Sequence, residues 1–108
     1  MTFWERGMNG YAVLGQWAAD VNGDMEAGAR ELRERIVPGV RAMPGFQHGA
    51  WSRSEDGSRL YSTIVFDAPE AAEALVASVH GNRSHAAASG VHLVSIEIQP
   101  LVASASAA

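Results

Sequence analysis

The sequence predicts one α+β domain whose elements follow one another as strand, helix, strand, strand, helix, strand. Three patterns indicate this order: apolar residues at alternate positions in four segments, apolar residues at helical spacing in two others, and an Asp-Gly pair between the central strands. Two β-α-β halves of this kind form a ferredoxin-like four-stranded antiparallel sheet with both helices on one face. The expected domain covers residues 10–102, between an N-terminal extension at residues 1–9 and a flexible tail at residues 103–108.

Four segments show the alternation of a strand. The expected strands are residues 11–18, 46–53, 60–66 and 91–102. In the last of them Val94, Ile96 and Ile98 alternate with polar residues and are expected to share one face. The pair Asp56-Gly57 separates the second and third strands, and such a pair between two strand-like runs is typical of a hairpin turn.

Two segments show helical spacing. From Met25 to Met43 apolar residues recur at steps of three and four, which places them on one helical face. Pro38 is expected to kink or end this helix, because proline has no backbone N–H to donate. The second helix is expected to begin after a capping Asp67 and to end before residues 84–90, which fit either a short helical turn or a loop.

The composition narrows the possible functions. The chain has 12 acidic residues against 8 basic ones, giving a formal net charge of −4, and every basic residue is arginine. No basic patch is present, so we expect no nucleic-acid partner. There is no cysteine, and His80 and His85 are spaced five apart rather than the three or four of a ligand pair on one helical face, so we expect no metal site. No stretch reaches the ~20 apolar residues of a membrane span, and we expect a cytoplasmic protein.

The expected strands are apolar on both faces, which indicates a partner. Ala12 and Leu14 lie opposite Val13 in the first strand, and Tyr61 and Val65 alternate with core residues in the third. Two helices cover only one side of a sheet, and soluble monomers rarely expose a large apolar face. We therefore expect a homodimer that forms through the open sheet face. The alternative is a monomer in which polar residues make that face wet enough, namely Gln47, Ser62, Thr63 and Ser95.

Residues 43–75, MPGFQHGAWSRSEDGSRLYSTIVFDAPEAAEAL, resemble the antibiotic biosynthesis monooxygenase-like group of dimeric α+β barrels. The similar features are Pro-Gly-Phe at the start of the second strand, Asp-Gly in the hairpin, and Phe-Asp before an alanine-rich helix. The resemblance implies a dimeric α+β barrel. It also implies a possible activity, a cofactor-independent monooxygenase acting on a small aromatic or polyketide-like molecule, with no bound cofactor.

The family's functional positions hold other residues in this chain. Oxygenases of the group that oxidise polycyclic phenols carry Asn and Trp on the third strand and Tyr early in the second helix; the matching positions are Ser62, Phe66 and Ala72. The haem-degrading relatives use an Asn, a Trp and a His, and the matching positions here are Gln16, Leu75 and His85. Neither set is retained as a whole, so haem binding is a third and weaker expectation.

The candidate site consists of two histidines and a group of side chains for a flat ligand. His85, and after it His48, are the candidate catalytic bases, since imidazole titrates near neutrality and could remove a phenolic or enolic proton. The candidate substrate-binding residues are Trp17, Trp51, Tyr61, Phe66 and Gln16. Arg59 and Arg83 could hold a carboxylate or phenolate. The competing hypothesis is a non-catalytic dimeric protein that binds a small ligand or serves as a scaffold.

Overall fold

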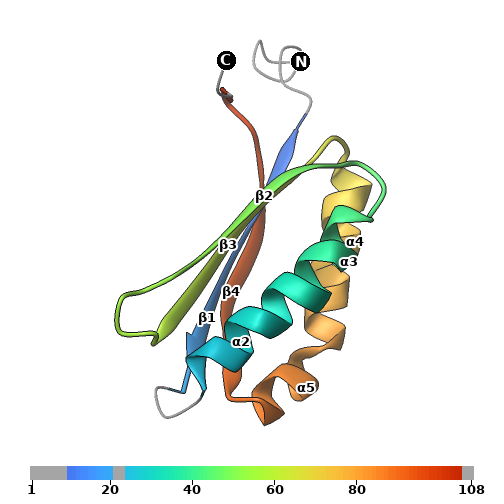
Figure 1. Ribbon diagram of the computed structural model, residues 1–108. Coiled ribbons are helices and arrows are strands. Elements are labelled where there is room, and N and C mark those ends of the chain that lie inside the picture. Colours follow the sequence, from blue (N-terminus) through green and yellow to red (C-terminus); the bar gives the residue numbers. More distant parts are fainter. Residues whose placement is uncertain (1–9, 21–23, 106–108) are drawn as a thin grey trace.

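The computed structural model describes residues 10–20 and 24–105, so the expected N-terminal extension at residues 1–9 lies outside the described residues. Its strands are β1 (Tyr11–Ala19), β2 (Phe46–Arg53), β3 (Arg59–Phe66) and β4 (Val91–Pro100). They form one antiparallel sheet in the order β2-β3-β1-β4, and the helices cover one of its faces (Figure 1). The predicted α+β, ferredoxin-like fold is confirmed.

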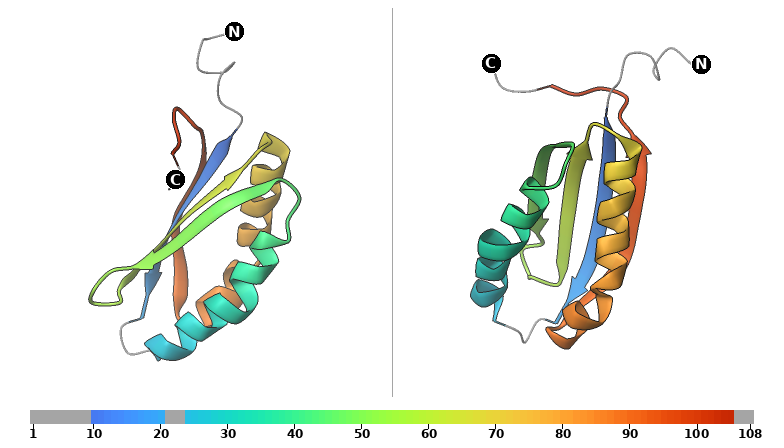
Figure 2. Two further views of the ribbon diagram at one scale, coloured as in Figure 1. Left: turned by 45° about the horizontal axis from the view of Figure 1, so that its top comes forward. Right: turned by 90° about the vertical axis from the view of Figure 1, so that its right-hand side faces the viewer.

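The helical elements form two arms across the sheet. The first arm runs through α2 (Met25–Glu31), η1 (Leu32–Ile36) and α3 (Val37–Arg41), and the second through α4 (Pro69–Gly81) and α5 (Arg83–Ala88). The two arms lie side by side over the same sheet face (Figure 2). Residues 84–90 fitted either a short helical turn or a loop, and most of them form the short helix α5. None of the helices in residues 10–20 and 24–105 is long and apolar enough to cross a membrane.

The core lies between the two central strands, the end of the first arm and the second arm. Val13 of β1 pairs with Ile64 of β3 on one side and with Ile98 of β4 on the other. Val13 and Phe66 are completely buried, and Leu75 of α4 closes the cluster from above. Burying a side chain of this size stabilises the fold by about 1.5–3 kcal/mol relative to leaving it exposed. The core therefore depends on the face of β1 and β3 that the alternating pattern had predicted.

Pro38 neither ends nor visibly interrupts the first arm, contrary to the kink or termination expected from the sequence. It lies in the first turn of α3, where a missing N–H costs little. The turn before it, η1, is a π-helix, in which the N–H of Val37 donates to the carbonyl of Leu32 five residues earlier. This wider turn changes the hydrogen-bonding register just ahead of the proline, and the arm continues as α3.

The first arm is fixed to the rest of the molecule at its two ends. At its start the Met25 side chain lies over Gly57 in the β2–β3 turn, and Arg53 Nη1 donates to the Met25 carbonyl over 3.1 Å. At its end Val40 is buried in the core. Between these points α2 and η1 bury no residue, and Ile36 stays 39 % exposed. The apolar face expected for this helix exists, but its middle is not packed into the core.

Two local expectations were wrong. The residue that caps α4 is Ala68, without a side-chain hydrogen bond, while the backbone N–H of Asp67 donates to the Gly45 carbonyl over 2.9 Å. In β4 the register against β1 shifts between Gln16 and Trp17, which leaves Val94 out of the pairing and 50 % exposed. A β-bulge of this kind inserts one extra residue, so Val94 does not share the core face with Ile96.

The sheet face away from the helices carries a mixture of apolar and polar side chains. Ala12 and Val65 lie there as a cross-strand pair and are buried. Next to them the side chain of Leu101 lies against Gly10. Leu14 is only partly buried, and Tyr61 is 42 % exposed. The central strands therefore carry apolar side chains on both of their faces, as the sequence predicted.

The β2–β3 turn is organised around Asp56. Its Oδ1 accepts hydrogen bonds from the Ser58 hydroxyl at 2.7 Å, the Ser58 N–H at 2.9 Å and the Ser54 hydroxyl at 2.8 Å. These bonds favour the ionised carboxylate and lower the pKa of Asp56 from 3.8 to about 2, the Ser58 hydroxyl being the largest cause. Gly57 follows with a φ of +78°, a conformation that suits glycine.

Asp56→Ala should lower the free energy of unfolding at neutral pH, because three donors lose their acceptor. A group whose pKa is depressed on folding contributes stability above its unfolded pKa and loses it as the pH falls through the folded one. The difference between wild type and variant should therefore shrink below pH ~4 and vanish near pH ~2. Thermal unfolding of both proteins at a series of pH values measures this. A difference that does not change with pH would contradict the role given to the ionised carboxylate.

Candidate functional site

The same three-residue pattern occurs on two strands of the sheet. β1 contains Gly15-Gln16-Trp17 and β2 contains Gly49-Ala50-Trp51, so each tryptophan follows a glycine by two positions and lies on the same face of its strand. A Cβ built on Gly15 would lie 2.6 Å from Trp17 Cζ3, and one on Gly49 would lie 3.0 Å from Trp51 Cη2. The six-membered ring of each indole therefore lies over a glycine, in space that the side chain of a larger residue would occupy.

The two tryptophans flank Ser62 on β3. Ser62 pairs with Gly15 on one side and with Trp51 on the other, and its Oγ would lie 2.8 Å from a Cβ at Gly15. Ser62 is the one buried polar residue in the described part of the chain. We call Gly15, Trp17, Gly49, Trp51 and Ser62 the aromatic platform. It combines two partly exposed indoles with one buried hydroxyl on the sheet.

The platform lies on the helix-covered face of the sheet but is not sealed there. Trp51 packs against the core cluster, and the pairing of Gly15 with Ile96 places Trp17 on the same side. Both indoles nevertheless remain partly exposed. The arm above this face, α2 and η1, buries no residue. The partly exposed indoles of Trp17 and Trp51 are the aromatic surfaces of this face on which a flat ligand could stack, although neither depression described below is lined by a platform residue.

The structure divides the predicted site residues between two faces. Trp17 and Trp51 belong to the platform, and Phe66 lies on the same side but is completely buried, with its ring 6.3 Å from that of Phe46 in an edge-to-face arrangement. Gln16 and Tyr61 form a cross-strand pair on the opposite, open face. The five predicted substrate-binding residues are therefore not brought together in one place.

Neither predicted histidine base reaches the platform. His48 on β2 pairs with Val65, which places it on the open face, and it is exposed. His85 is exposed on the short helix α5. The haem-related positions are also apart, because Gln16 is on the open face, Leu75 is in the core and His85 is on α5.

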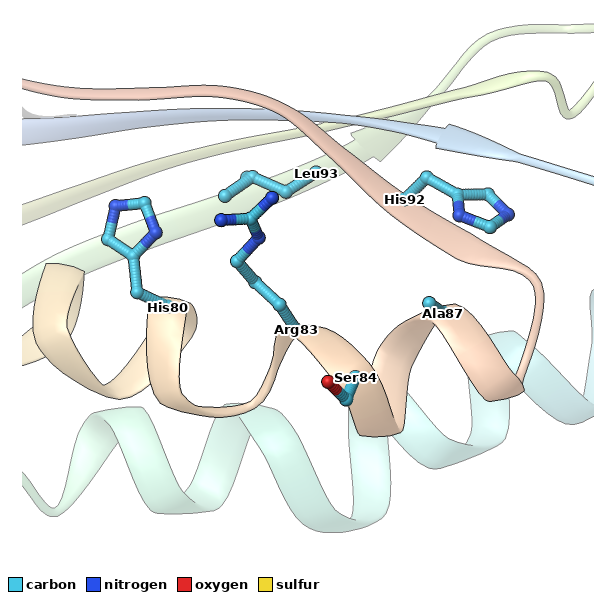
Figure 3. Close-up of a pocket in the computed structure, with 6 residues that line it drawn as sticks. All are labelled: His80, Arg83, Ser84, Ala87, His92 and Leu93. Atoms are coloured by element: carbon cyan, nitrogen blue, oxygen red, sulfur yellow. The ribbon is translucent and has the colours of Figure 1, made fainter.

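The remaining two histidines lie in a depression at the end of the second arm. Its volume is about 400 Å³, and it is lined by His80, Arg83, Ser84, Ala87, His92 and Leu93 (Figure 3). Leu93 pairs with Trp17 across the β1–β4 register, so the depression adjoins the strand positions of the platform. A second depression of about 370 Å³ lies at the opposite end of α4 and includes the carboxylates of Asp67 and Glu70. Among residues 10–20 and 24–105 no group of three His, Asp or Glu side chains could hold a metal ion.

The comparisons with known proteins support the fold. No family model matches the sequence, and no curated protein matches it. Among solved structures, a protein of Chloroflexus aurantiacus J-10-fl, provisionally assigned as an antibiotic biosynthesis monooxygenase, aligns with a TM-score of 0.63 and 22 % identity over 90 % of this chain and 97 % of its own. The monooxygenase ActVA-Orf6 of Streptomyces coelicolor, solved with Nanaomycin D, gives 0.61 and 11 % over 99 % and 98 %.

A third match is SnoaB, a cofactor-independent oxygenase of Streptomyces nogalater, with a TM-score of 0.60 and 15 % identity over 91 % of this chain and 96 % of its own. At these identities the likeness establishes the architecture. The resemblance that residues 43–75 indicated is thus confirmed at the level of the fold, which this chain shares with antibiotic biosynthesis monooxygenase-like proteins.

Sequence reasoning named both tryptophans but missed what supports them. The signal was present, since the Gly-x-Trp pattern occurs twice, on strands that run parallel because both are antiparallel to β3. Ser62 was noted only as a family position and as a polar residue of the sheet. The grouping of His80, Arg83 and His92 does not follow from their spacing, because it depends on how two helices and the strand after them fold against one another.

Gly15→Ala should displace the Trp17 indole, because the new methyl group would collide with its ring and with Ser62 Oγ. Overpacking of this kind costs about 1–3 kcal/mol, measured here as the free energy of unfolding in urea, together with a changed tryptophan emission spectrum. The matched control is Gly28→Ala on α2, where a Cβ meets no atom within 4 Å. That control should be stabilised by about 0.5–1 kcal/mol. A Gly15→Ala protein as stable as wild type, with unchanged emission, would show that Trp17 does not lie over this glycine.

Proposed function

We propose that the protein is a cofactor-independent monooxygenase that binds a small aromatic or polyketide-like molecule on the aromatic platform. The observation that carries the proposal is the pair of partly exposed indoles, each lying over a glycine and flanking the Ser62 hydroxyl. Two fold relatives support the chemistry: one was solved with Nanaomycin D, and the other is a cofactor-independent oxygenase. We expect the protein to act in the cytoplasm.

In the proposed reaction the substrate itself supplies the electrons. A base removes a proton from an activated ring carbon, as in an anthrone, and the resulting carbanion reduces dioxygen to form a carbon–oxygen bond. The hydroperoxide then loses water and leaves a carbonyl, so one oxygen atom enters the product and the other leaves as water. The platform would hold the rings flat, and the Ser62 hydroxyl could donate to a substrate oxygen on which charge develops.

The base in this scheme is a histidine. His85 and His48 stay the candidates from the sequence, and His80 joins them because its depression includes Leu93, the cross-strand neighbour of Trp17. His48 would serve only if substrate reached the open face, where Gln16 and Tyr61 also lie. Each of the three histidines would thus act on a substrate bound at a different place on the molecule.

Oxygen uptake with a dihydroxyanthrone as the probe substrate tests the proposal. We expect the purified protein, with no added metal or flavin, to accelerate uptake and to form the quinone. Changing the base to alanine should lower kcat by about 10²–10⁴-fold, while the other two histidine variants retain activity. Trp51→Leu should raise KM, because a stacking surface is lost. If the wild-type protein leaves the uncatalysed rate unchanged, this substrate class is wrong; if all three histidine variants match wild type, a histidine base is wrong.

One observation favours the non-catalytic alternative, a dimeric small-ligand-binding or scaffold protein. Within the described residues, the strand positions on the helix-covered face of the sheet, where the platform lies, include no histidine, aspartate or glutamate. Proton abstraction at the platform would need a group from a helix. Quenching of tryptophan fluorescence by the same anthrone under nitrogen measures binding alone. Saturable quenching without any oxygen uptake in air would favour this alternative.

We also propose that two copies associate through the open sheet face. Leu14 and Tyr61 remain accessible there, beside the apolar pair Ala12 and Val65. A second copy of the chain is the partner that suits this face. A two-fold axis would place the apolar residues at the centre of one sheet against the same residues of the other sheet.

Leu14→Glu should convert the dimer into a monomer, because a charge would be buried at the centre of the interface. Analytical ultracentrifugation measures the mass of each species. Ala77→Glu is the matched control, since it adds the same charge to an exposed position of α4 and should leave the dimer intact. A wild-type protein that sediments as a monomer at all concentrations would contradict the proposed association.

A further inference from the structure

The depression at the end of the second arm is lined by one arginine and two histidines and by no carboxylate. Arg83 extends from α5 toward Leu93, with His80 of α4 on one side and His92 of β4 on the other (Figure 3). The chain as a whole carries a formal net charge of −4. His80, Arg83 and His92, which come from α4, α5 and β4, line one hollow of about 400 Å³, and the His92 ring is directed away from Arg83.

Arg83 is available for a ligand. In the described part of the chain the ion pairs of arginine are Arg33 with Glu26 and Arg35 with Glu31, and Arg83 is in neither. No carboxylate is among the residues that line the depression. Outside the lining, Asp20 Oδ1 lies 3.7 Å from His92 Nε2.

The chemistry of these groups favours an oxyanion over a metal. A guanidinium repels a cation and offers several N–H donors in a planar fork that matches carboxylate or phosphate oxygens. The Ser84 hydroxyl and the imidazole N–H groups of His80 and His92 can add further hydrogen bonds. The Leu93 side chain provides an apolar wall on the side of the sheet.

We infer that this depression is a binding site for the oxyanion group of a small molecule, a carboxylate or a phosphate, with Arg83 as its principal ligand. The inference rests on the lining of the depression and does not depend on the proposed oxygenation. If both hold, the position of Leu93 beside Trp17 favours an aromatic substrate that carries an acidic substituent.

Titration with inorganic phosphate and with acetate, followed by NMR of the histidine ring protons, tests the site. Ionic strength is held constant with sodium chloride, so that general screening does not change during the titration. We expect saturable shifts of His80 and His92 and none of His48, which lies on the open sheet face. The two anions distinguish the sources, since a site for phosphate groups binds phosphate more tightly and a site for carboxylates binds acetate at least as well.

Arg83→Ala should weaken binding at least about tenfold, equivalent to ~1.4 kcal/mol. Arg83→Lys keeps the charge and should recover part of the affinity, since a point charge replaces a bidentate donor. Arg30→Ala is the matched control, because it removes one positive charge from an exposed position of α2 outside the depression.

Two results would overturn the inference. The first is a wild-type titration in which neither anion gives saturable shifts of His80 and His92. The second is equal weakening in Arg83→Ala and Arg30→Ala, which would assign the effect to overall charge. Neither result bears on oxygen uptake by the platform, so failure of this site and failure of the oxygenase proposal can be told apart.

Discussion

The attachment of the first helical arm at its two ends determines how the rest of this molecule is arranged. Met25 lies over Gly57 in the β2–β3 turn, and Val40 lies in the core, while the turns between them bury nothing. Had the whole apolar face packed onto the sheet, both tryptophans would be enclosed core residues. Because it does not, the helix-covered face keeps aromatic surface accessible. The candidate site is thus a consequence of incomplete packing in one layer.

The two glycines of the platform matter because they have no side chain. An indole whose ring lies over its own strand needs the position two residues earlier to be free of a side chain, and Gly15 and Gly49 provide that space. Glycine within a strand is unfavourable by roughly 0.5–1 kcal/mol relative to alanine. Two such positions on the same face of the sheet therefore lower stability, and they leave room for the partly exposed rings of Trp17 and Trp51.

The fold could be predicted from the sequence because it follows from periodicity. Alternation assigned Val13 and Ile64 to the core face, and the Asp-Gly pair placed the hairpin. Expectations failed where one residue changes a register, as with Val94 at the β-bulge and Pro38 after the π-turn, since such insertions leave little trace in a hydrophobic pattern. The candidate site was predicted only in part. Alternation shows that Trp17 and Gln16 lie on opposite faces, but it does not show which face offers room for a ligand.

The π-turn η1 gives the first arm a geometric property of its own. A π-turn is an α-helix with one extra residue accommodated locally, so the arm contains one residue more than an unbroken α-helix with the same ends would need. Each residue of an α-helix turns by about 100° about the axis. A chain one residue shorter between Leu32 and Ile36 could therefore continue as an unbroken α-helix and keep Met25 over Gly57. The same deletion within α2 would instead turn Met25 by about 100° about the helix axis, away from the hairpin. The position of Met25 therefore depends on the number of residues in each part of the first arm more than on which residues they are.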